Sequence, residues 1–540
     1  MDCYVAVEEG YAAVSEGVPK DFQAALAHPL WGDPARDELN KLVSEKGTLV
    51  EVDKTIAIEA KKSGADLVIL FPVYEKKIRD GKEVYKVRLV CNGKHQHNPG
   101  QTYSPTPTRE EFFLFLHFIA HNDWDFCHID EARAFLNSKY KGATDVYTRI
   151  PGTKSYYKVI GAIYGLRGSP LHYRQDVVKR YVNMGYVPLH NCSCIFFKKH
   201  DDGHITFVFI FVDDFLITGS SRQAIEDTVN GYKEVATTTE PLWDPPMVLG
   251  HRIERDRDKK IIKIDLASKI EELAEEYSVT DMRPRHTPMS PSGYIIRDDD
   301  YNKLSKEHQR LLTVKEKKMY QAIVGSNIWI YACRPDILFA VMYLTWYSHA
   351  PRLHHLLMAY QVVCFLYTTR NEPLVLGGCD DIRVHTYSDS SYGTGRDGRS
   401  ISGHFTRLGP KSGAIYGRSH LSRYTRLSVF TSELESLTGA VKSTIRFQYI
   451  LHALQLQPHV PLQFADNKAM IDFVKSNAEA KGVRHLEIKM YFVREKFQMS
   501  LFDLQHMDGE IIPADYLTKL TTAENHQLFM KDILGHNLLT

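Results

Sequence analysis

The segment ITFVFIFVDDFLITGS, residues 205–220, contains the most informative pattern in the chain. An apolar run rich in β-branched and aromatic residues precedes two aspartates and resumes after them, which predicts two strands joined by a tight turn. Carboxylates in a partly buried turn, here Asp213 and Asp214, repel each other and lose solvation unless cations neutralise them. Hard divalent cations prefer such carboxylate oxygens. An isolated Asp-Asp pair is an exposed turn in most proteins, but the apolar strands on both sides favour a metal site here.

Composition sets the limits within which this pattern is interpreted. The 540 residues are enough for several domains, and 43% hydrophobic with 25% charged residues is the balance of a folded protein. Lys plus Arg number 67 against 66 Asp plus Glu, so net charge neither supports nor excludes nucleic-acid binding. We expect an intracellular protein without a membrane partner, because the sequence shows no membrane-length apolar run and no secretory signal pattern. The eight scattered cysteines do not suggest a disulfide framework.

Local patterns predict further elements along the chain. REEFFLFLHFIAHND at 109–123 is typical of a buried helix, and RQAIEDTVNGYKEVA at 222–236 also predicts a helix. Alternating strands are expected between residues 67 and 92, with Asp80-Gly81 as a hairpin turn. A Pro- and Ser-rich stretch at 285–300 is the best linker candidate.

Two more segments place the aspartate pair in an ordered series. IDEARAFLN ends a predicted strand at Asp130, and IYGLRGSPLHY begins at Ile163, between Asp130 and the hairpin. The three segments together resemble the catalytic region of copia-type retrotransposon reverse transcriptases, in the order that the family has them. Other parts of the chain are also similar to this family, so that the resemblance covers roughly residues 22–530.

The resemblance implies roles for particular side chains of the first domain. Asp130, Asp213 and Asp214 would hold two magnesium ions, with manganese as an alternative, because two metals stabilise the attacking and leaving oxygens of phosphoryl transfer. Phe135 would exclude a ribose 2′-hydroxyl, and Arg88 would meet the incoming triphosphate; a core position for Phe135 and a surface ion pair for Arg88 are the alternatives. The residues implied to line the nucleotide and template path are Tyr164, Gly165, Leu166, Arg167, Gly168, Ser169 and Pro170.

Two positions depart from the family's pattern. Gly168 stands where a Gln is expected, and His172 stands where a Trp is expected. These departures leave the predicted metal site intact and concern the details of template contact.

A second set of acids lies near the C-terminus, in YSDSSYG, SELESLTGA, QFADNKAM and IPADYLTK. Four acids from separate elements can converge only through tertiary folding, which is how a two-metal nuclease is built. The segments resemble the copia-type ribonuclease H pattern, which implies magnesium ligands at Asp389, Glu435, Asp466 and Asp515. Glu433 is the alternative to Glu435, which we prefer because it takes the place of the later Glu in the family's pattern.

The resemblance also implies the architecture. We expect α+β and α/β folds, namely a right-hand polymerase of palm, fingers and thumb followed by a ribonuclease H-like mixed-sheet domain. The expected division comprises an N-terminal lead (1–21), the reverse transcriptase (22–285), a linker and connection region (286–380), the ribonuclease H-like domain (381–525) and a C-terminal tail (526–540).

The implied function is that of a nucleotidyltransferase from a retrotransposon polyprotein, which acts in the replication of a transposable element before DNA integration. It would be an RNA- and DNA-directed DNA polymerase that also cleaves RNA in RNA–DNA hybrids. Its partners would be an RNA template, a DNA primer, the hybrid, deoxynucleoside triphosphates and other polyprotein products, in a cytoplasmic virus-like particle or the nucleus. The alternatives are a truncated or decayed copy that only binds nucleic acid, and a plain metal nuclease whose first domain binds substrate.

Overall fold

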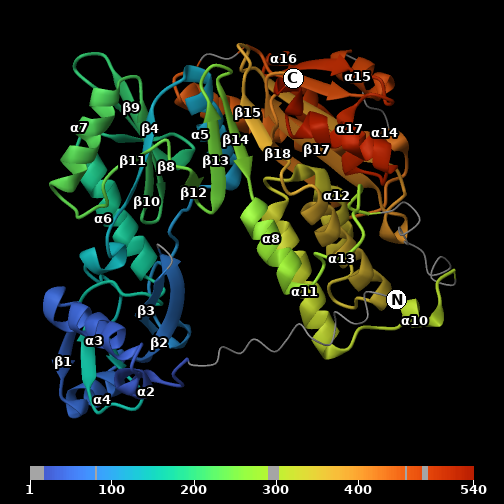
Figure 1. The fold of residues 1–540 in the computed structure, drawn as a ribbon. Helices are drawn as coiled ribbons and strands as arrows, with labels where there is room; N and C mark the ends of the chain where they lie inside the picture. Colours follow the sequence, from blue (N-terminus) through green and yellow to red (C-terminus); the bar gives the residue numbers. More distant parts are fainter. Residues whose placement is uncertain (1–17, 80–81, 290–302, 457–458, 477–483, 540) are drawn as a thin grey trace.

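The computed structural model describes most of the chain, namely residues 18–79, 82–289, 303–456, 459–476 and 484–539. The predicted turn at Asp80-Gly81 and most of the predicted linker lie outside the described residues. Within those ranges the chain forms four sheets. Figure 1 shows the first two sheets on one side of the molecule, the long helices α8 and α11 in the middle, and the last sheet on the other side.

The first sheet has five strands in the order β1-β6-β5-β2-β3. In chain order they are Leu49–Val52 (β1), Asp66–Arg79 (β2), Lys82–Cys91 (β3), Val146–Arg149 (β5) and Tyr156–Val159 (β6). The helices beside them are Phe22–Ala27 (α2), Gly32–Asn40 (α3) and Lys54–Lys62 (α4). Trp31 is buried and packs edge-on against Tyr74 and Tyr85, at centroid distances of 5.1 and 4.8 Å, which fixes α3 on β2 and β3.

The second sheet contains the predicted Asp-Asp hairpin. Its order is β11-β4-β10-β9-β8-β7. The strands are Phe126–Asp130 (β4), Val187–Leu189 (β7), Cys192–Lys199 (β8), Ile205–Phe211 (β9), Asp214–Gly219 (β10) and Leu242–Trp243 (β11). Strands β9 and β10 pair antiparallel, which confirms the strand–turn–strand prediction.

Both faces of this sheet are covered by helices, which explains why β9 is apolar at nearly every position. Phe207 and Phe209 pack with Arg109–Asn122 (α5), whereas Val208 and Ile210 belong to the core shared with Ser169–Asn183 (α6) and Arg222–Lys233 (α7). A capping box of Thr108 and Glu111 begins α5, and ten of its residues are buried, as its sequence predicts.

A third sheet and a group of helices connect the two ends of the chain. Its order is β12-β13-β14-β15, with bounds Met247–Val248, His251–Asp256, Ile261–Asp265 and Leu374–Gly377. The neighbouring helices are Ala267–Glu276 (α8), Lys306–Gln309 (α10), Val314–Ile330 (α11), Leu338–Thr345 (α12) and Leu353–Thr368 (α13). Because β14 pairs with β15, segments more than a hundred positions apart share one sheet.

The last sheet is mixed, in the order β18-β17-β16-β19-β20. Its strands are Val384–Ser391 (β16), Ile401–Leu408 (β17), Ala414–Leu421 (β18), Leu462–Ala465 (β19) and Asp503–His506 (β20). The first three pair antiparallel, and β19 and β20 join them in parallel. The helices of this unit are Val429–Ala453 (α14), Lys468–Lys475 (α15), Arg484–Gln498 (α16) and Ala523–Ile533 (α17).

The predicted C-terminal tail is part of the packed structure. Helix α17 buries Phe529, Met530 and Ile533 in the large core that also contains β15 and α13. In the described ranges, no helix is both long and apolar enough to cross a membrane.

Candidate active sites

The aspartates predicted to form the polymerase site lie where strands β4 and β10 pair. Their register places Asp214 opposite Asp130, and Asp213 occupies the turn between β9 and β10. The backbone N–H of Glu131 donates to the carbonyl of Asp213 at 3.0 Å, which ties the end of β4 to the turn. Asp130 and Asp214, 84 positions apart in the sequence, are therefore neighbours in the sheet, as a metal site requires.

The turn itself is held in an uncommon backbone conformation. Val212 has a φ of +58°, in the left-handed region that β-branched residues rarely adopt. Such strained residues persist where the surrounding structure enforces them, and they cluster at functional sites. Here the conformation reverses the chain directly before Asp213.

Burial and mutual repulsion act on these carboxyl groups. The pKa of Asp130 is raised by burial and then by the nearby Asp213 and Asp214 carboxylates. Burial also raises the pKa of Asp213, with Asp214 adding to the rise and the Arg88 guanidinium opposing it. A divalent cation would relieve both effects, because it favours the charged form of each carboxyl.

Asp214 differs from the other two. Its Oδ1 lies 2.7 Å from Nε2 of His128, which stands two positions before Asp130 on β4. The Asp214 carboxylate thus has a partner within the protein. Among the described residues, the one group of three acids with ligand atoms within 4.8 Å of one another lies elsewhere in the fold.

Three of the predicted substrate-binding residues lie near this hairpin. Arg88 on β3 donates to Glu75 on β2 at 3.0 Å, so it takes part in an ion pair as well as facing Asp213. The rings of Phe135 and Tyr164 meet edge-on at 5.1 Å, and the pKa of Tyr164 is raised by burial and then by Asp213. The structure therefore brings Arg88, Phe135 and Tyr164 to the aspartate hairpin.

The Tyr164–Pro170 segment is built around a close backbone approach. Gly165 has a φ of +89°, and a Cβ there would meet the carbonyl oxygen of Cys91 at 2.0 Å. Ser169 accepts a hydrogen bond from the N–H of Ile163, and Arg167 donates to the carbonyl of Lys94. Pro170 lies in the first turn of α6. The Ser169 side chain is buried and shapes the loop.

The two departures from the family's pattern lie against each other. A Cβ at Gly168 would come within 3.0 Å of Cε1 of His172. The His172 ring is buried, contacts Tyr140 edge-on, and its Nδ1 accepts from the N–H of Lys141 at 3.3 Å. The small residue at 168 leaves room for the imidazole at 172.

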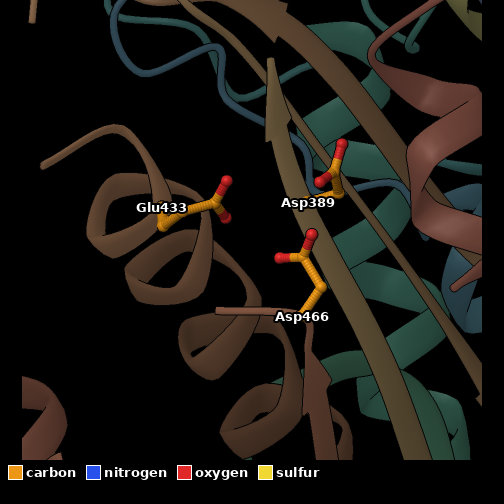
Figure 2. Close-up of side chains that lie close together, drawn as sticks. All are labelled: Asp389, Glu433 and Asp466. Carbon is orange, nitrogen blue, oxygen red and sulfur yellow. The ribbon is translucent and has the colours of Figure 1, made fainter. Parts of the chain in front are cut away.

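A second acidic site lies in the C-terminal sheet. Asp389 on β16, Asp466 directly after β19 and Glu433 on α14 offer ligand atoms that all lie within 4.8 Å of one another. Figure 2 shows the three carboxyl groups directed toward a common space between the helix and the strands. Three segments separated along the chain thus converge on one point.

This geometry favours Glu433 over Glu435, the residue preferred from the sequence. Side chains two positions apart on a helix do not share a face. Glu433 therefore faces the aspartates, whereas Glu435 forms ion pairs with Arg426 and with Lys489, the latter at 3.2 Å. Burial opposes the charged form of Glu435, but the two cations lower its pKa overall.

The cluster has the properties of a cation site. Burial raises the pKa of Asp389 to about 6, and burial together with the two aspartates raises that of Glu433 to about 9. The buried Oδ1 of Asp466 has no hydrogen-bond partner among the described residues. Three carboxylates that repel one another and an unsatisfied oxygen fit a hard divalent cation.

Asp515 lies at the edge of this cluster. Its charge raises the pKa of Asp389 and Asp466, after the larger effect of burial on each, and its carboxylate pairs with Lys519. Thr518 donates to Oδ2 of Asp389. Sequence reasoning did not single out Thr518 or Lys519, although both stand in the IPADYLTK segment.

Comparison with known proteins shows similarity over most of the chain. Residues 61–291 match the family model described as reverse transcriptase (RNA-dependent DNA polymerase). The chain is 25% identical over 537 residues to the Pol polyprotein of transposon TNT 1-94 from Nicotiana tabacum, which covers 96% of the chain. The chain is thus similar in sequence to transposon Pol polyproteins. It is also 24% identical to the RE1 polyprotein of Arabidopsis thaliana over 83% of its length.

These copia-like relatives are much longer proteins. The chain spans 39% of the tobacco polyprotein and 30% of the Arabidopsis one. Solved structures with the same fold include two of the foamy viral protease-reverse transcriptase in complex with double-stranded DNA. The first is 11% identical with a TM-score of 0.51, and the match covers 87% of this chain and 69% of the viral chain. The second is 13% identical with a TM-score of 0.50, and the match covers 88% of this chain and 83% of the viral chain. The predicted fold, polymerase followed by a ribonuclease H-like domain, is confirmed.

Proposed function

We propose that this chain is an RNA- and DNA-directed DNA polymerase that also cleaves the RNA strand of RNA–DNA hybrids. The observation that carries the proposal is the presence of two separate acidic sites on two sheets of one chain. One is the aspartate hairpin on the second sheet, and the other is the carboxylate cluster on the mixed sheet. The match to the reverse transcriptase family supports the first activity.

At the polymerase site, Asp130 and Asp213 would hold the metal, and Asp214 would support the site through His128. Arg88 would leave Glu75 for the phosphates of a deoxynucleoside triphosphate, since a guanidinium binds either anion in a planar fork. Phe135 would lie against the sugar, supported by Tyr164. Two magnesium or manganese ions would supply charge stabilisation for the attacking and leaving oxygens.

At the nuclease site, Asp389, Glu433 and Asp466 would hold the metal ions, with Asp515 at the edge. Lys519 would keep the Asp515 carboxylate in place. The substrates of the two sites would be an RNA template with its DNA primer and the resulting hybrid. The titles of the foamy viral structures name double-stranded DNA and an RNA/DNA hybrid, which supports these partners.

We also propose the domain division expected from the sequence: reverse transcriptase at 22–285, connection region at 286–380 and ribonuclease H-like domain at 381–525. Residues 526–539 would then form a structural part of the core instead of a free tail. As part of a retrotransposon polyprotein, the chain would act inside the cell with other products of that polyprotein.

The experiment is primer extension on an RNA template with magnesium, together with cleavage of a labelled hybrid. The proposal expects the wild-type chain to perform both reactions. A chain that binds the hybrid but performs neither would support the decayed-copy alternative. Cleavage without extension would support the plain metal nuclease.

A further inference from the structure

Directly after Asp130, Glu131 is an acid that the proposed chemistry does not use. Its side chain has no exposed surface. Burying a carboxylate is costly unless the protein supplies enough hydrogen bonds and an opposite charge. A buried acid beside a proposed metal ligand therefore requires a physical account.

The structure supplies Glu131 with four donors. Three elements contribute them: the 3₁₀ turn Ala134–Asn137 and helices α6 and α7. The donors are the hydroxyls of Tyr173 and Tyr232, at 2.9 and 2.7 Å on Oε2, and the guanidinium of Arg180 and amide of Asn137, each at 2.8 Å on Oε1. Both carboxylate oxygens are thus bound twice, which leaves Glu131 little freedom to move.

The backbone of the same residue holds the reacting acids. Its N–H donates to the carbonyl of Asp213, so any shift of Glu131 moves the turn that carries this aspartate. On its other side, the N–H of Asp130 donates to Oγ1 of Thr239 at 3.0 Å, and the carbonyl of Asp130 accepts from the N–H of Thr239. The polymerase aspartates are therefore attached to the two helices through one side chain.

The network also reaches the predicted sugar contact. Tyr173, one of the donors to Glu131, packs edge-on against Phe135 at a centroid distance of 5.4 Å. Arg180 also donates to the Tyr232 hydroxyl at 3.2 Å, which joins the two helices directly. A single buried carboxylate thus lies between the metal-binding turn, the nucleotide-facing aromatic ring and the helices behind the sheet.

We propose that Glu131 is a positioning residue of the polymerase site, which holds Asp130 and Asp213 at the spacing that a divalent cation needs. It does not touch the substrate. The proposal rests on the proposed polymerase function. It extends that function, because the buried Glu131, paired with Arg180, would set the geometry of the metal site.

The test compares Glu131→Gln with wild type in primer extension over a range of magnesium concentrations. Glutamine keeps the shape of the side chain. However, its amide nitrogen is itself a donor and would face two protein donors in place of an accepting oxygen. Glutamine also lacks the negative charge that pairs with Arg180. Supporting groups around metal ligands typically contribute about 10- to 100-fold in metal affinity or activity. We expect at least about a tenfold higher magnesium concentration at half-maximal extension, with hybrid cleavage unchanged.

A matched control separates positioning from general destabilisation. Asp336 is also fully buried and paired, with Arg334 at 2.7 Å, and it lies in neither acidic site. Asp336→Asn should lower the melting temperature as Glu131→Gln does, yet leave the magnesium requirement of extension as in wild type. If the requirement rises equally in both variants, Glu131 has only a structural role and the inference is wrong.

A milder variant covers the case in which Glu131→Gln does not fold. Tyr232→Phe removes one of the four donors, and we expect the magnesium requirement to rise by a smaller factor. An unchanged requirement in every folded variant would overturn the inference while the polymerase assignment stands. Absence of extension by the wild-type chain would instead remove the proposed function itself.

Discussion

The two acidic sites of this chain are assembled in different ways. In the C-terminal sheet, Asp389, Glu433 and Asp466 approach one another directly, and the protein supplies few partners for their charges. In the polymerase hairpin the acids are spread over a strand pair, and neighbouring groups bind two of the acids there: His128 binds Asp214, and four donors bind Glu131. The acids of the C-terminal cluster are therefore already close enough to share a cation. In the hairpin, some of the acids bind neighbouring protein groups and so fix the positions of the others.

The difference teaches what each site needs from its partners. Carboxylates held together with few compensating partners should bind a divalent cation in the absence of nucleic acid, because the cation removes their repulsion. Acids that are spread along a hairpin need the phosphates of a nucleotide to complete the coordination of a cation that itself prefers such ligands. We therefore expect metal to bind the nuclease site first.

Of the two glutamates on α14, Glu433 is expected to have much the larger effect on hybrid cleavage. Glu433→Gln should lower hybrid cleavage by at least about a hundredfold, because several kcal/mol of metal-based stabilisation are lost and each 1.4 kcal/mol is tenfold. Glu435→Gln should change cleavage only a few-fold, since Glu435 pairs with Arg426 and Lys489 outside the cluster. Single-turnover cleavage of a labelled hybrid measures both. A larger loss of cleavage in Glu435→Gln than in Glu433→Gln would show that Glu435, and not Glu433, belongs to the metal site.

A smaller effect is expected at the second aspartate of the hairpin. Asp213→Asn should abolish extension, whereas Asp214→Asn should reduce it by about tenfold, as loss of a supporting group around a metal site does. His128→Ala should resemble Asp214→Asn, because the two side chains form one pair. Steady-state primer extension compares the three variants. Equal loss in Asp213→Asn and Asp214→Asn would make both aspartates direct metal ligands.

The pH dependence of metal binding sharpens the contrast between the sites. Because Glu433 has a pKa of about 9 and Asp389 of about 6, the cluster without metal retains protons that a cation must displace. We expect the magnesium concentration for half-maximal cleavage to fall as pH rises from 6 to 9. Glu433→Gln should flatten this dependence. A requirement independent of pH would show that the Glu433 proton is absent in solution.

The same pKa shift predicts how stability varies with pH. Burial and the two aspartates raise the pKa of Glu433 to about 9 in the folded state, whereas a glutamate in an unfolded chain has a pKa of about 4.5. The folded state thus binds more protons between these values, and stability without metal should decrease as pH rises through this window. Thermal unfolding at pH 6 and pH 8 with a chelator measures it. Added magnesium should remove most of the difference.

The smallest effect is expected where the chain departs from its relatives. Gly168→Ala places a Cβ within 3.0 Å of the His172 ring, which the ring can relieve by a small shift. Overpacking of this kind costs about 1–3 kcal/mol. A double-mutant cycle with His172→Ala should show coupling between the two positions. Additive unfolding free energies would mean that the departures are independent.

Much of the fold could be predicted because its signals are local. The β9–β10 hairpin, the buried helix α5 and the amphipathic helix α7 follow from apolar periodicity and capping residues alone. The pairing of β14 with β15 could not be predicted, because nothing local in residues 261–265 specifies a partner a hundred positions away. Similarly, the burial of α17 depends on a core built from the middle of the chain.

Some residues of the candidate sites could be predicted from local patterns, whereas others depend on tertiary packing. Asp130, Asp213, Asp389 and Asp466 stand at strand ends, where a pattern and a resemblance can identify them. The choice between Glu433 and Glu435 needed the rotation of α14 relative to the sheet, which a pattern of alternating acids does not specify. The positioning role proposed for Glu131 could not be predicted from the sequence, because its hydrogen-bond donors come from three other elements.

The central claim is that one chain carries two independent acidic sites. A single assay tests it most directly: one RNA template with a DNA primer, in which extension and template cleavage are measured together for wild type, Asp213→Asn and Asp466→Asn. We expect that Asp213→Asn cleaves without extending, that Asp466→Asn extends without cleaving, and that a mixture of the two variants performs both reactions. Loss of both activities in either variant, with the fold intact, would contradict the central claim.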